Sequence, residues 1–214
     1  SAGQRCSALR VLCLQDDVAD HTLKMLRGAM AECRMGNPGR LTTDIGPVID
    51  EEAKTNIERH IQAMRAKGRP VFQAVRENSD DAREWQTGTF IAPTLIELES
   101  FDELQKEVFG PVLHVVRYTR NNLGNLIEQI NASGYGLTLG VHTRIDETIA
   151  HVTGSAHVGN LYVNRNMVGA VVGVQPFGGE GLSGTGPKAG GPLYLYRLLA
   201  NRPENALGIT LARQ

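Results

Sequence analysis

The chain has 214 residues, of which 41% are hydrophobic and 21% charged, in the ordinary range for a globular protein. With 22 basic and 23 acidic residues the net charge is -1, so electrostatics gives no reason to expect nucleic acid or a membrane surface as a partner of this segment. It has no apolar run of the roughly 20 residues that span a bilayer, and we expect no signal peptide. Its three widely spaced cysteines favour a reducing cytoplasm over a disulfide scaffold.

The first third of the chain predicts a strand followed by two amphipathic helices. Residues 8–15 are apolar and β-prone, and Asp16 and Asp17 are suited to cap a helix that runs through about Glu32. Asp50 is typical of the N-cap of the second helix. The apolar stripes that predict these helices are Leu23, Leu26, Met30 and Cys33 in the first, and Ala53, Ile57, Ile61 and Met64 in the second.

Short β-like runs at 70–75 and 89–98 precede a regular alternation of strands and helices. In chain order this alternation is a strand at 112–118, a helix with the apolar face Leu123, Leu126, Ile127 and Ile130, a strand at 137–143, a helix with Ile145, Ile149 and Val152, and a strand at 159–163. Such alternation predicts crossover connections, and hence an α/β fold with a mostly parallel sheet and flanking helices. A single domain over residues 1–214 is the simplest organisation.

The segment 164–192 differs in composition, because it is dense in glycine and contains Pro176, Pro187 and Pro192. That is too much glycine and proline for a helix or a regular strand. A long structureless segment in a compact domain is usually functional or disordered, and the valines and Phe177 in this one argue against disorder. We therefore predict a binding loop.

Cys6 is the candidate nucleophile of the chain. It stands in Gly3-Gln4-Arg5-Cys6-Ser7-Ala8, just ahead of the first predicted strand, where a nearby cation or helix end can favour the thiolate. For an unplaced cysteine the ordinary alternative is a small buried hydrophobe or a residue on a frayed end. That alternative is adopted for Cys13 and Cys33, which lie in the apolar strand and on the apolar stripe.

Residues 179–184 match the dinucleotide-binding pattern G-x-G-x-x-G, and Glu204 follows at about twenty residues, where a ribose-binding acid would stand. That fingerprint requires a strand, a turn and a helix. Pro176 stands where the strand should end, and Pro187 and the pair 190–191 stand where the helix should run. The match is therefore rejected.

Glu107-Val108-Phe109-Gly110-Pro111 lies between a polar helical turn and a strand. An acid followed by an aromatic ring and a rigid turn suits a grip on a ribose beside a flat ring, although spacing alone favours an ordinary turn before a strand. Six histidines share no spacing and are expected to be structural or exposed: His21, His60, His114, His142, His151 and His157. We expect no metal site, because no Cys/His cluster has zinc-binding spacing.

Taken in order, three motifs resemble the aldehyde dehydrogenase superfamily. They are G-Q-x-C at 3–6, E-x-F-G-P at 107–111, and P-F-G-G at 176–179 followed by S-G-x-G at 183–186, with Asn164 between the second and the third. Each motif alone is weak, but their order and spacing match as well, and the resemblance covers essentially the whole chain. It implies the catalytic domain of such an enzyme without its Rossmann-like NAD domain.

The resemblance also implies a reaction. Cys6 would attack an aldehyde to give a thiohemiacetal, with its backbone N–H helping to hold the oxyanion. Hydride transfer to the nicotinamide of NAD would leave a thioester, which water hydrolyses. Glu107 would bind the nicotinamide ribose, and Phe109 would pack near the nicotinamide.

The segment 168–177 is similar to the aldehyde-anchor loop of glutamate-semialdehyde (pyrroline-5-carboxylate) dehydrogenases, in which a serine typically follows the nucleophile, as Ser7 does here. The resemblance implies that Ser7, Gly169 and Ala170 bind the distal carboxylate of the substrate through hydroxyl and backbone N–H groups. Such a backbone nest binds an anion without a cationic side chain. Phe177 would pack on the aliphatic part of the substrate.

The whole stretch resembles the C-terminal part of the proline utilization A family, in which a proline dehydrogenase with FAD precedes this aldehyde dehydrogenase in one bacterial chain. In that family the general-base glutamate, the oxyanion asparagine and the NAD-binding domain lie upstream of the cysteine, outside these 214 residues. The resemblance therefore implies a fragment that needs the NAD-binding domain of its own chain and is inactive when isolated. It also implies a homo-oligomer for the full protein.

Three alternatives stay open at this point. One is a dehydrogenase for another carboxylated aldehyde such as succinate semialdehyde, which the anchor loop would discriminate. Another is a cysteine acyltransferase or hydrolase that uses Cys6 with a partner the sequence does not identify. The third is a fragment that acts only in folding, oligomerisation or interaction, because removal of a neighbouring domain exposes apolar surface.

Overall fold

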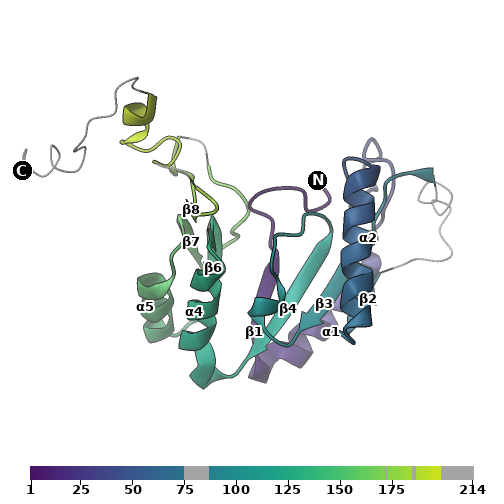
Figure 1. Ribbon diagram of the computed structural model, residues 1–214, viewed down its shortest axis with the longest axis horizontal. Helices are drawn as coiled ribbons and strands as arrows, with labels where there is room; N and C mark the ends of the chain where they lie inside the picture. The colour runs from purple at the N-terminus through teal and green to yellow at the C-terminus, as the bar shows by residue number, and fades with distance from the viewer. Residues whose placement is uncertain (75–86, 172, 185–186, 199–214) are drawn as a thin grey trace, which may run out of the picture. The chain divides into compact units, whose positions relative to one another are not determined.

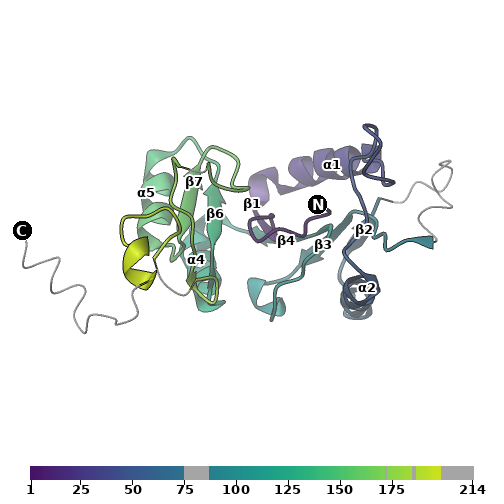
Figure 2. The same ribbon diagram turned by 90° about the horizontal axis from the view of Figure 1, so that it is seen from above.

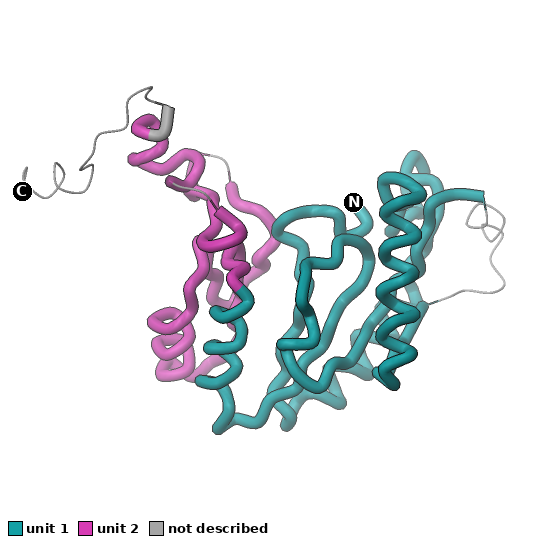
Figure 3. The backbone as a smooth tube through the Cα atoms, viewed as in Figure 1, with its two compact units in different colours: residues 1–133 teal, residues 134–214 magenta. Residues whose placement is uncertain are grey.

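The computed structural model describes residues 1–74, 87–171, 173–184 and 187–198. It divides the chain into two compact units, residues 1–133 and 134–214 (Figure 3), and each is described by itself. Five residues of the predicted elements and motifs lie outside the described residues: Val75, Val172, Thr185, Gly186 and Glu204. The organisation of residues 1–214 as one domain stays a prediction.

The first unit is built on a four-stranded sheet with the order β1-β4-β3-β2. Its strands are β1 (Val11–Gln15), β2 (Val71–Gln73), β3 (Thr94–Leu98) and β4 (Val112–Tyr118). β4 pairs in parallel with both β1 and β3, and only β2 is antiparallel to its neighbour. The mostly parallel α/β fold predicted from the sequence is confirmed, although the first strand begins at Val11 rather than at residue 8.

Two helices cover opposite faces of this sheet, α1 (Asp16–Glu32) on one side and α2 (Glu51–Ala66) on the other (Figures 1 and 2). Successive strand residues point to opposite faces, so the strands supply two separate cores. The core under α1 contains Leu14, Ala19, Leu23, Leu95 and Val115. The core under α2 includes Ile57, Ile61, Met64, Ile96, Val112 and Val116, together with Leu126.

The two predicted helix starts differ in outcome. The carboxylate of Asp50 accepts a hydrogen bond from the backbone N–H of Ala53 at 2.8 Å, which confirms the predicted N-cap of α2. The prediction for α1 is wrong, because Gln15 occupies its N-cap and makes no side-chain cap bond. Asp16 and Asp17 lie instead inside the first turn, where their carboxylates face the positive end of the helix dipole.

The first unit ends with α4 (Leu123–Ala132), which two short 3-10 turns precede, η1 (Phe101–Glu103) and η2 (Arg120–Asn122). The predicted helix face is confirmed, since Leu126 and Ile127 of α4 are buried. Leu126 belongs to the same core as α2, with Ile130 packed against it.

In the second unit α5 (Asp146–Ser155) connects the parallel strands β6 (Thr138–Val141) and β7 (Asn160–Val163), as the sequence predicts. The predicted apolar face is confirmed only in part, because Val152 is buried, whereas Ile145 lies at the N-cap and is exposed. Sequence analysis did not anticipate the short antiparallel pair of β5 (Tyr135–Gly136) and β8 (Glu180–Gly181). The glycine-rich segment is otherwise irregular up to η3 (Tyr194–Leu198) where it is described. Its G-x-G-x-x-G stretch holds β8, and the next helical element in the described residues is the 3-10 turn η3, whereas the dinucleotide fingerprint has a strand before it and a helix that begins within it.

Candidate functional site

Cys6 lies on a tight turn that leads into β1. The N–H of Gln4 donates to the carbonyl of Ser1 at 3.0 Å, and the N–H of Ala8 donates to the carbonyl of Arg5 at 3.1 Å. The residue is exposed, whereas its neighbour Ser7 is buried, with 4% of its surface accessible. The fold therefore presents the Cys6 thiol at the surface of the first unit.

The other two cysteines have different surroundings. Burial raises the pKa of the Cys13 thiol to about 12, so it stays protonated at neutral pH. Cys33 lies at the C-cap of α1, with its sulfur 3.6 Å from the carbonyl oxygen of Ala29. All three cysteines are free of disulfides, and only Cys6 is exposed.

Gln4 ties the cysteine turn to the segment ahead of α2. Its side-chain carbonyl accepts a hydrogen bond from the N–H of Ile49 at 2.8 Å, and its amide donates to the carbonyl of Ser1 at 2.9 Å. The glutamine of the G-Q-x-C motif thus holds the backbone of the turn rather than pointing into solvent.

The cysteine turn and the E-x-F-G-P segment meet at two glycines. Gly3 has a φ of +67°, and a Cβ placed on it would collide with the carbonyl of Gly110. Gly110 has a φ of +125° and packs against the side chain of Ile57 in α2. Both positions favour glycine, because both φ values are positive and a Cβ would meet backbone at Gly3 and the Ile57 side chain at Gly110. Two motifs about a hundred residues apart in the sequence are therefore in direct backbone contact.

Arg10 connects the same two segments through its guanidinium. Nη1 donates to the carbonyl of Gly3 at 2.5 Å, Nη2 to the carbonyl of Arg5 at 2.7 Å, and Nε to the carboxylate of Glu107 at 3.0 Å. The guanidinium carbon also lies 4.2 Å from the centre of the Phe109 ring. The structure thereby links the cysteine turn to Glu107 and Phe109 within the first unit.

The predicted anchor residues Gly169, Ala170 and Phe177 belong to the second unit. Gly169 has a φ of +77° with open space at its Cβ position, and its carbonyl accepts a hydrogen bond from the Tyr162 hydroxyl at 3.1 Å. Tyr162 itself is buried, with 4% of its surface accessible. A buried strand residue therefore fixes one peptide group of the exposed loop.

The glycines of P-F-G-G and of the following S-G serve close backbone packing. A Cβ on Gly179 would collide with Ser183, and a Cβ on Gly159, just before β7, would collide with the carbonyl of Gly178. Phe177 exchanges two backbone hydrogen bonds with Ala189, at 3.0 and 2.9 Å. These contacts fold the glycine-rich segment against β7.

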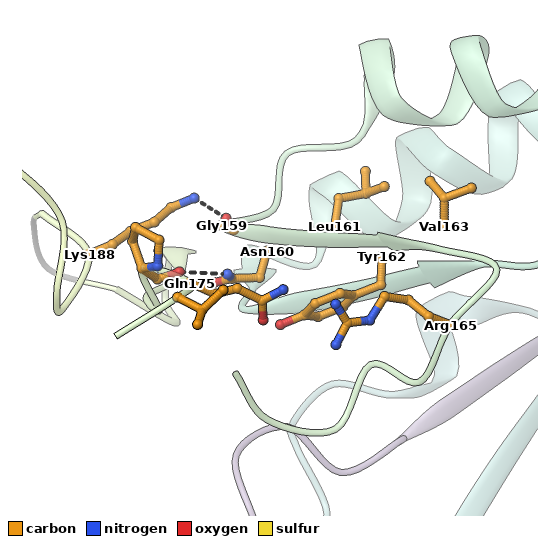
Figure 4. A pocket seen from close by; sticks show the side chains of 10 residues that line it. Gly159, Asn160, Leu161, Tyr162, Val163, Arg165, Gln175 and Lys188 are labelled. Carbon is orange, nitrogen blue, oxygen red and sulfur yellow. Dashed lines mark hydrogen bonds between the residues drawn. The ribbon is translucent and has the colours of Figure 1, made fainter. Parts of the chain in front are cut away.

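Asn160 of β7 holds the same segment with its side-chain amide. Its Nδ2 donates to the carbonyl of Pro176 at 2.9 Å (Figure 4). Its Oδ1 accepts from the N–H of Gly178 at 3.2 Å. Lys188 donates to the carbonyl of Gly159 from the other end of the segment. Phe177 is therefore bracketed by two residues whose backbones are fixed to β7.

Asn164 follows β7 in a left-handed conformation with a φ of +54°. Its Oδ1 accepts from the N–H of Thr143 at 2.9 Å, and its Nδ2 donates to the carbonyl of Thr143 at 2.8 Å. The side chain thus imitates a strand backbone and extends the β6–β7 pairing by one step. Asparagine tolerates this conformation better than most residues.

The second unit contains a pocket of about 410 Å³ that no sequence pattern indicated, formed by β7, Arg165, residues 174–176 and Lys188 (Figure 4). The guanidinium of Arg165 lies 4.9 Å from the ring centre of Tyr162. Arg165 therefore places a cation at the edge of this pocket, which residues 174–176 of the anchor loop also line.

Among the described residues no group of three or more His, Cys, Asp and Glu side chains could hold a metal ion, and no helix is long and apolar enough to cross a bilayer. His114 is buried, and its Nε2 lies 2.8 Å from Nε2 of His60, so at least these two histidines have a structural setting.

Arg10, Tyr162 and Asn160 were missed because sequence spacing says nothing of their contacts. A weak signal existed for Arg10, since a charged residue inside the apolar run 8–15 must either reach the surface or find partners. Tyr162 and Asn160 belong to a predicted strand and gave no signal of their own.

Comparison with known proteins gives consistent matches. The sequence model described as Aldehyde dehydrogenase family matches residues 1–200. The chain is 91% identical over 214 residues to the Bifunctional protein PutA of Escherichia coli (100% of this chain, 16% of that protein), and 36% identical over 196 residues to a 1-pyrroline-5-carboxylate dehydrogenase of Bacillus cereus (91% and 36%). A crystal structure of Bradyrhizobium japonicum Proline Utilization A (PutA) is similar, with a TM-score of 0.82 and 52% identity over 91% of this chain and 19% of that one. The chain thus spans only 16% of the first curated relatives it matches.

Proposed function

The chain belongs to the aldehyde dehydrogenase family, and from this premise we propose that it is the cysteine-bearing part of an enzyme that oxidises L-glutamate γ-semialdehyde to L-glutamate. The semialdehyde forms from pyrroline-5-carboxylate, NAD is the oxidant, and the reaction is the second step of proline breakdown. The proposal is supported by the identity to PutA and to 1-pyrroline-5-carboxylate dehydrogenases.

The observation that carries the proposal is the link between the cysteine turn and the E-x-F-G-P segment. Gly3 packs on Gly110, and Arg10 bonds to both the turn and Glu107. A hydride-transfer enzyme needs its nucleophile and its cofactor-binding side chains in fixed relation, because productive geometry tolerates little displacement. This fold joins those two parts directly.

Cys6 is the nucleophile in this proposal. Its thiolate sulfur attacks the aldehyde carbon, and the new C–S bond gives a thiohemiacetal whose oxyanion accepts a hydrogen bond from the Cys6 backbone N–H. After hydride has left that carbon, a thioester remains on Cys6. Water then cleaves the C–S bond, which releases glutamate and regenerates the thiol. Exposure of Cys6 at the surface of its unit is compatible with attack on a small substrate.

The chemistry of Glu107 and Phe109 fits a nicotinamide nucleotide. A carboxylate accepts hydrogen bonds from ribose hydroxyls, and the side chain of Glu107 is 27% exposed while it accepts from Arg10 through Oε1. Phe109 is 45% exposed and offers a flat apolar surface beside it. When bound, NAD would take up the hydride; Glu107 would orient its ribose, and Phe109 would limit the position of the nicotinamide ring.

Gly169 and Ala170 are proposed to hold the distal carboxylate of the substrate through their N–H groups, with Phe177 on its aliphatic part. The positive φ of Gly169 and the bond from Tyr162 support a preformed backbone nest. Ser7 is assigned to the same anchor, and its support is the family resemblance rather than its geometry, because the residue is buried in the first unit.

The parent protein supplies the remaining parts in this proposal. A general-base glutamate, an oxyanion asparagine and the NAD-binding domain would come from other segments of the same chain, and FAD would belong only to a proline dehydrogenase part. We propose a cytoplasmic homo-oligomer as the parent, and no steady turnover by the 214-residue segment alone. The segment would bind neither nucleic acid nor a membrane.

The test is NADH formation from NAD and pyrroline-5-carboxylate by the full-length parent, beside its Cys6→Ser variant. Activity in the parent that is nearly absent in the variant supports both the reaction and the nucleophile. Oxidation of succinate semialdehyde instead would retain the family but refute the substrate. A fully active Cys6→Ser variant would refute the mechanism.

A second measurement distinguishes the proposed enzyme part from a fragment that acts only in folding, oligomerisation or interaction. The isolated segment is assayed for NADH and sedimented over a concentration series. Steady NADH production would contradict the need for the missing domain, whereas concentration-dependent association would show the exposed apolar surface expected of a separated fragment.

A further inference from the structure

Arg10 has an unusual set of partners for a residue at the edge of a strand. Three nitrogens of its guanidinium bond to three acceptors, namely the carbonyls of Gly3 and Arg5 and the carboxylate of Glu107, while only 15% of its side chain is exposed. Both carbonyls belong to the turn that carries Cys6. A residue four positions after the thiol therefore fixes the backbone that precedes it.

The same guanidinium also constrains two side chains of the E-x-F-G-P segment. Its Nε bonds to Glu107, and its carbon lies 4.2 Å above the ring of Phe109. Glu107 and Phe109 cannot change rotamer independently while Arg10 holds one by an ion pair and the other by a cation–π contact. One planar cation thus sets the position of both.

The backbone of Arg10 is itself anchored to the sheet. Its carbonyl accepts the N–H of His114 at 3.0 Å, and Nδ1 of the buried His114 lies 3.2 Å from the same oxygen. Because β4 carries His114 in register with Val11, the strand pairing itself determines where the Arg10 side chain starts. The link between the two motifs is therefore built on the rigid sheet.

We infer that Arg10 is a positioning residue that sets the distance and orientation between the Cys6 thiol and the pair Glu107 and Phe109, an inference that rests on the proposed function. In that function hydride leaves the carbon bound to the Cys6 sulfur for a ring placed by Glu107 and Phe109. Displacement of the Cys6 sulfur, or of Glu107 and Phe109, by about 1 Å can lower the rate on the order of 100-fold. Arg10 touches neither reacting atom and acts through the groups it holds.

Lysine cannot replace this side chain. Its ammonium is a compact point charge, whereas the guanidinium directs donors along fixed planar axes to separate acceptors and stacks on aromatic faces. Arg10→Lys keeps the positive charge but removes the planar arrangement of donors, while Arg10→Gln removes both the charge and that arrangement. Arg59→Gln is a matched control, because Arg59 is exposed on α2 and bonds only to the neighbouring Asn56 within the described residues.

The experiment uses the full-length parent and measures kcat, the KM for NAD and the KM for pyrroline-5-carboxylate. Both Arg10 variants are expected to raise the KM for NAD and to lower kcat/KM by about 100-fold, with no rescue by lysine. The Arg59→Gln variant is expected to match the parent. Cys13 counts the folded molecules, because burial keeps its thiol protonated and protected from iodoacetamide until the chain unfolds, so that a loss through misfolding is corrected for.

Iodoacetamide also gives a readout without turnover. In the parent, saturating NAD is expected to change the rate of Cys6 alkylation, and in both Arg10 variants that response is expected to disappear. An Arg10→Lys variant with parental KM values and a parental response to NAD would overturn the inference. So would a loss of activity that equals the loss of molecules with a protected Cys13. If the parent shows no activity on pyrroline-5-carboxylate, the proposed function fails, while the alkylation response still decides the role of Arg10.

Discussion

Gly3 and Gly110 lie in contact so close that a Cβ on Gly3 would overlap the carbonyl of Gly110. One belongs to the cysteine turn and the other to the E-x-F-G-P segment. This approach explains the glycine at position 3, whereas a Cβ on Gly110 would meet the side chain of Ile57. Both residues also have positive φ values, +67° and +125°, which favour glycine.

Gly3→Ala is expected to push the cysteine turn away from Gly110 and to reduce kcat/KM of the full-length parent by at least about tenfold, a smaller loss than the roughly 100-fold of a full 1 Å displacement. Steady-state kinetics checks this. Gly28→Ala is the matched control, because Gly28 lies on the exposed side of α1 with open space at its Cβ position. That change should stabilise the helix by about 0.5–1 kcal/mol and leave kinetics unchanged. Equal kinetics for both variants would contradict a role for the contact.

Tyr162→Phe tests how the anchor loop is held. Because a peptide group is planar and trans, a bond from the Tyr162 hydroxyl to the Gly169 carbonyl turns the Ala170 N–H to the opposite side. Loss of that bond, worth about 1 kcal/mol, should raise the KM for pyrroline-5-carboxylate about fivefold and leave the KM for NAD unaltered.

Tyr196→Phe serves as the control for the loss of a hydroxyl, since Tyr196 is 48% exposed and lies in η3. Only Tyr162→Phe should raise the KM for pyrroline-5-carboxylate, and neither variant should alter the KM for NAD. An unchanged KM for pyrroline-5-carboxylate in Tyr162→Phe, or an equal rise in both KM values, would count against orientation of the loop by Tyr162.

The elements of this fold could be predicted where the information is local. The apolar stripe and the Asp50 cap define α2, and the bounds of β4 follow from the run at 112–118, which is apolar except for His114 and Arg117. By contrast, β5 and β8 have two residues each and depend on pairing between segments about 45 residues apart, which a periodicity of two cannot reveal in so short a stretch.

Some residues of the candidate site could likewise be predicted from local sequence, whereas others depend on the tertiary fold. Cys6, Glu107 and Phe109 could be named from motif order, but Arg10 reaches Glu107 across 97 residues of sequence. Such a contact depends on strand register and side-chain direction, which are properties of the tertiary fold. Tyr162 was invisible for the same reason, because a tyrosine in an apolar strand is consistent with plain core packing.

Asn164 predicts a graded response to substitution. Its side chain makes two bonds to the backbone of Thr143, each worth about 1 kcal/mol, and its φ of +54° is unfavourable for alanine. Asn164→Gly should lose only the bonds, whereas Asn164→Ala should lose the bonds and add roughly 1–2 kcal/mol of backbone strain. Hydrogen exchange over residues 137–165 of the parent should therefore accelerate more in the alanine variant.

Asn56→Ala provides the control in the other unit, because Asn56 is an exposed residue of α2. It should leave exchange over residues 137–165 unaltered. If the glycine variant exchanges as fast as the alanine variant, backbone strain at this position contributes nothing, and if neither changes, the extension of the β6–β7 pairing is not stabilising.

His114 predicts a pH dependence of the sheet. Burial, followed by the nearby His60, lowers the pKa of His114 to about 4, from an ordinary value of 6.5. The Arg10 carbonyl can only accept, so Nδ1 of His114 carries the proton, and its Nε2 accepts from Nε2–H of His60. Protonation of His114 would leave two donors facing each other.

Between pH 6.5 and 4 the unfolded chain therefore binds a proton that the folded chain does not, and stability falls as pH falls through this window. The full effect of such a shift is about 3 kcal/mol.

Hydrogen exchange of β1 and β4 in the parent, corrected for intrinsic exchange rates, should show protection lost progressively below pH 6.5. His114→Gln can still donate to the Arg10 carbonyl but cannot take up a proton, so its protection should vary less with pH. His151→Gln, at an exposed position of α5, should retain the parental profile, and a parental profile in His114→Gln would assign the effect to other groups.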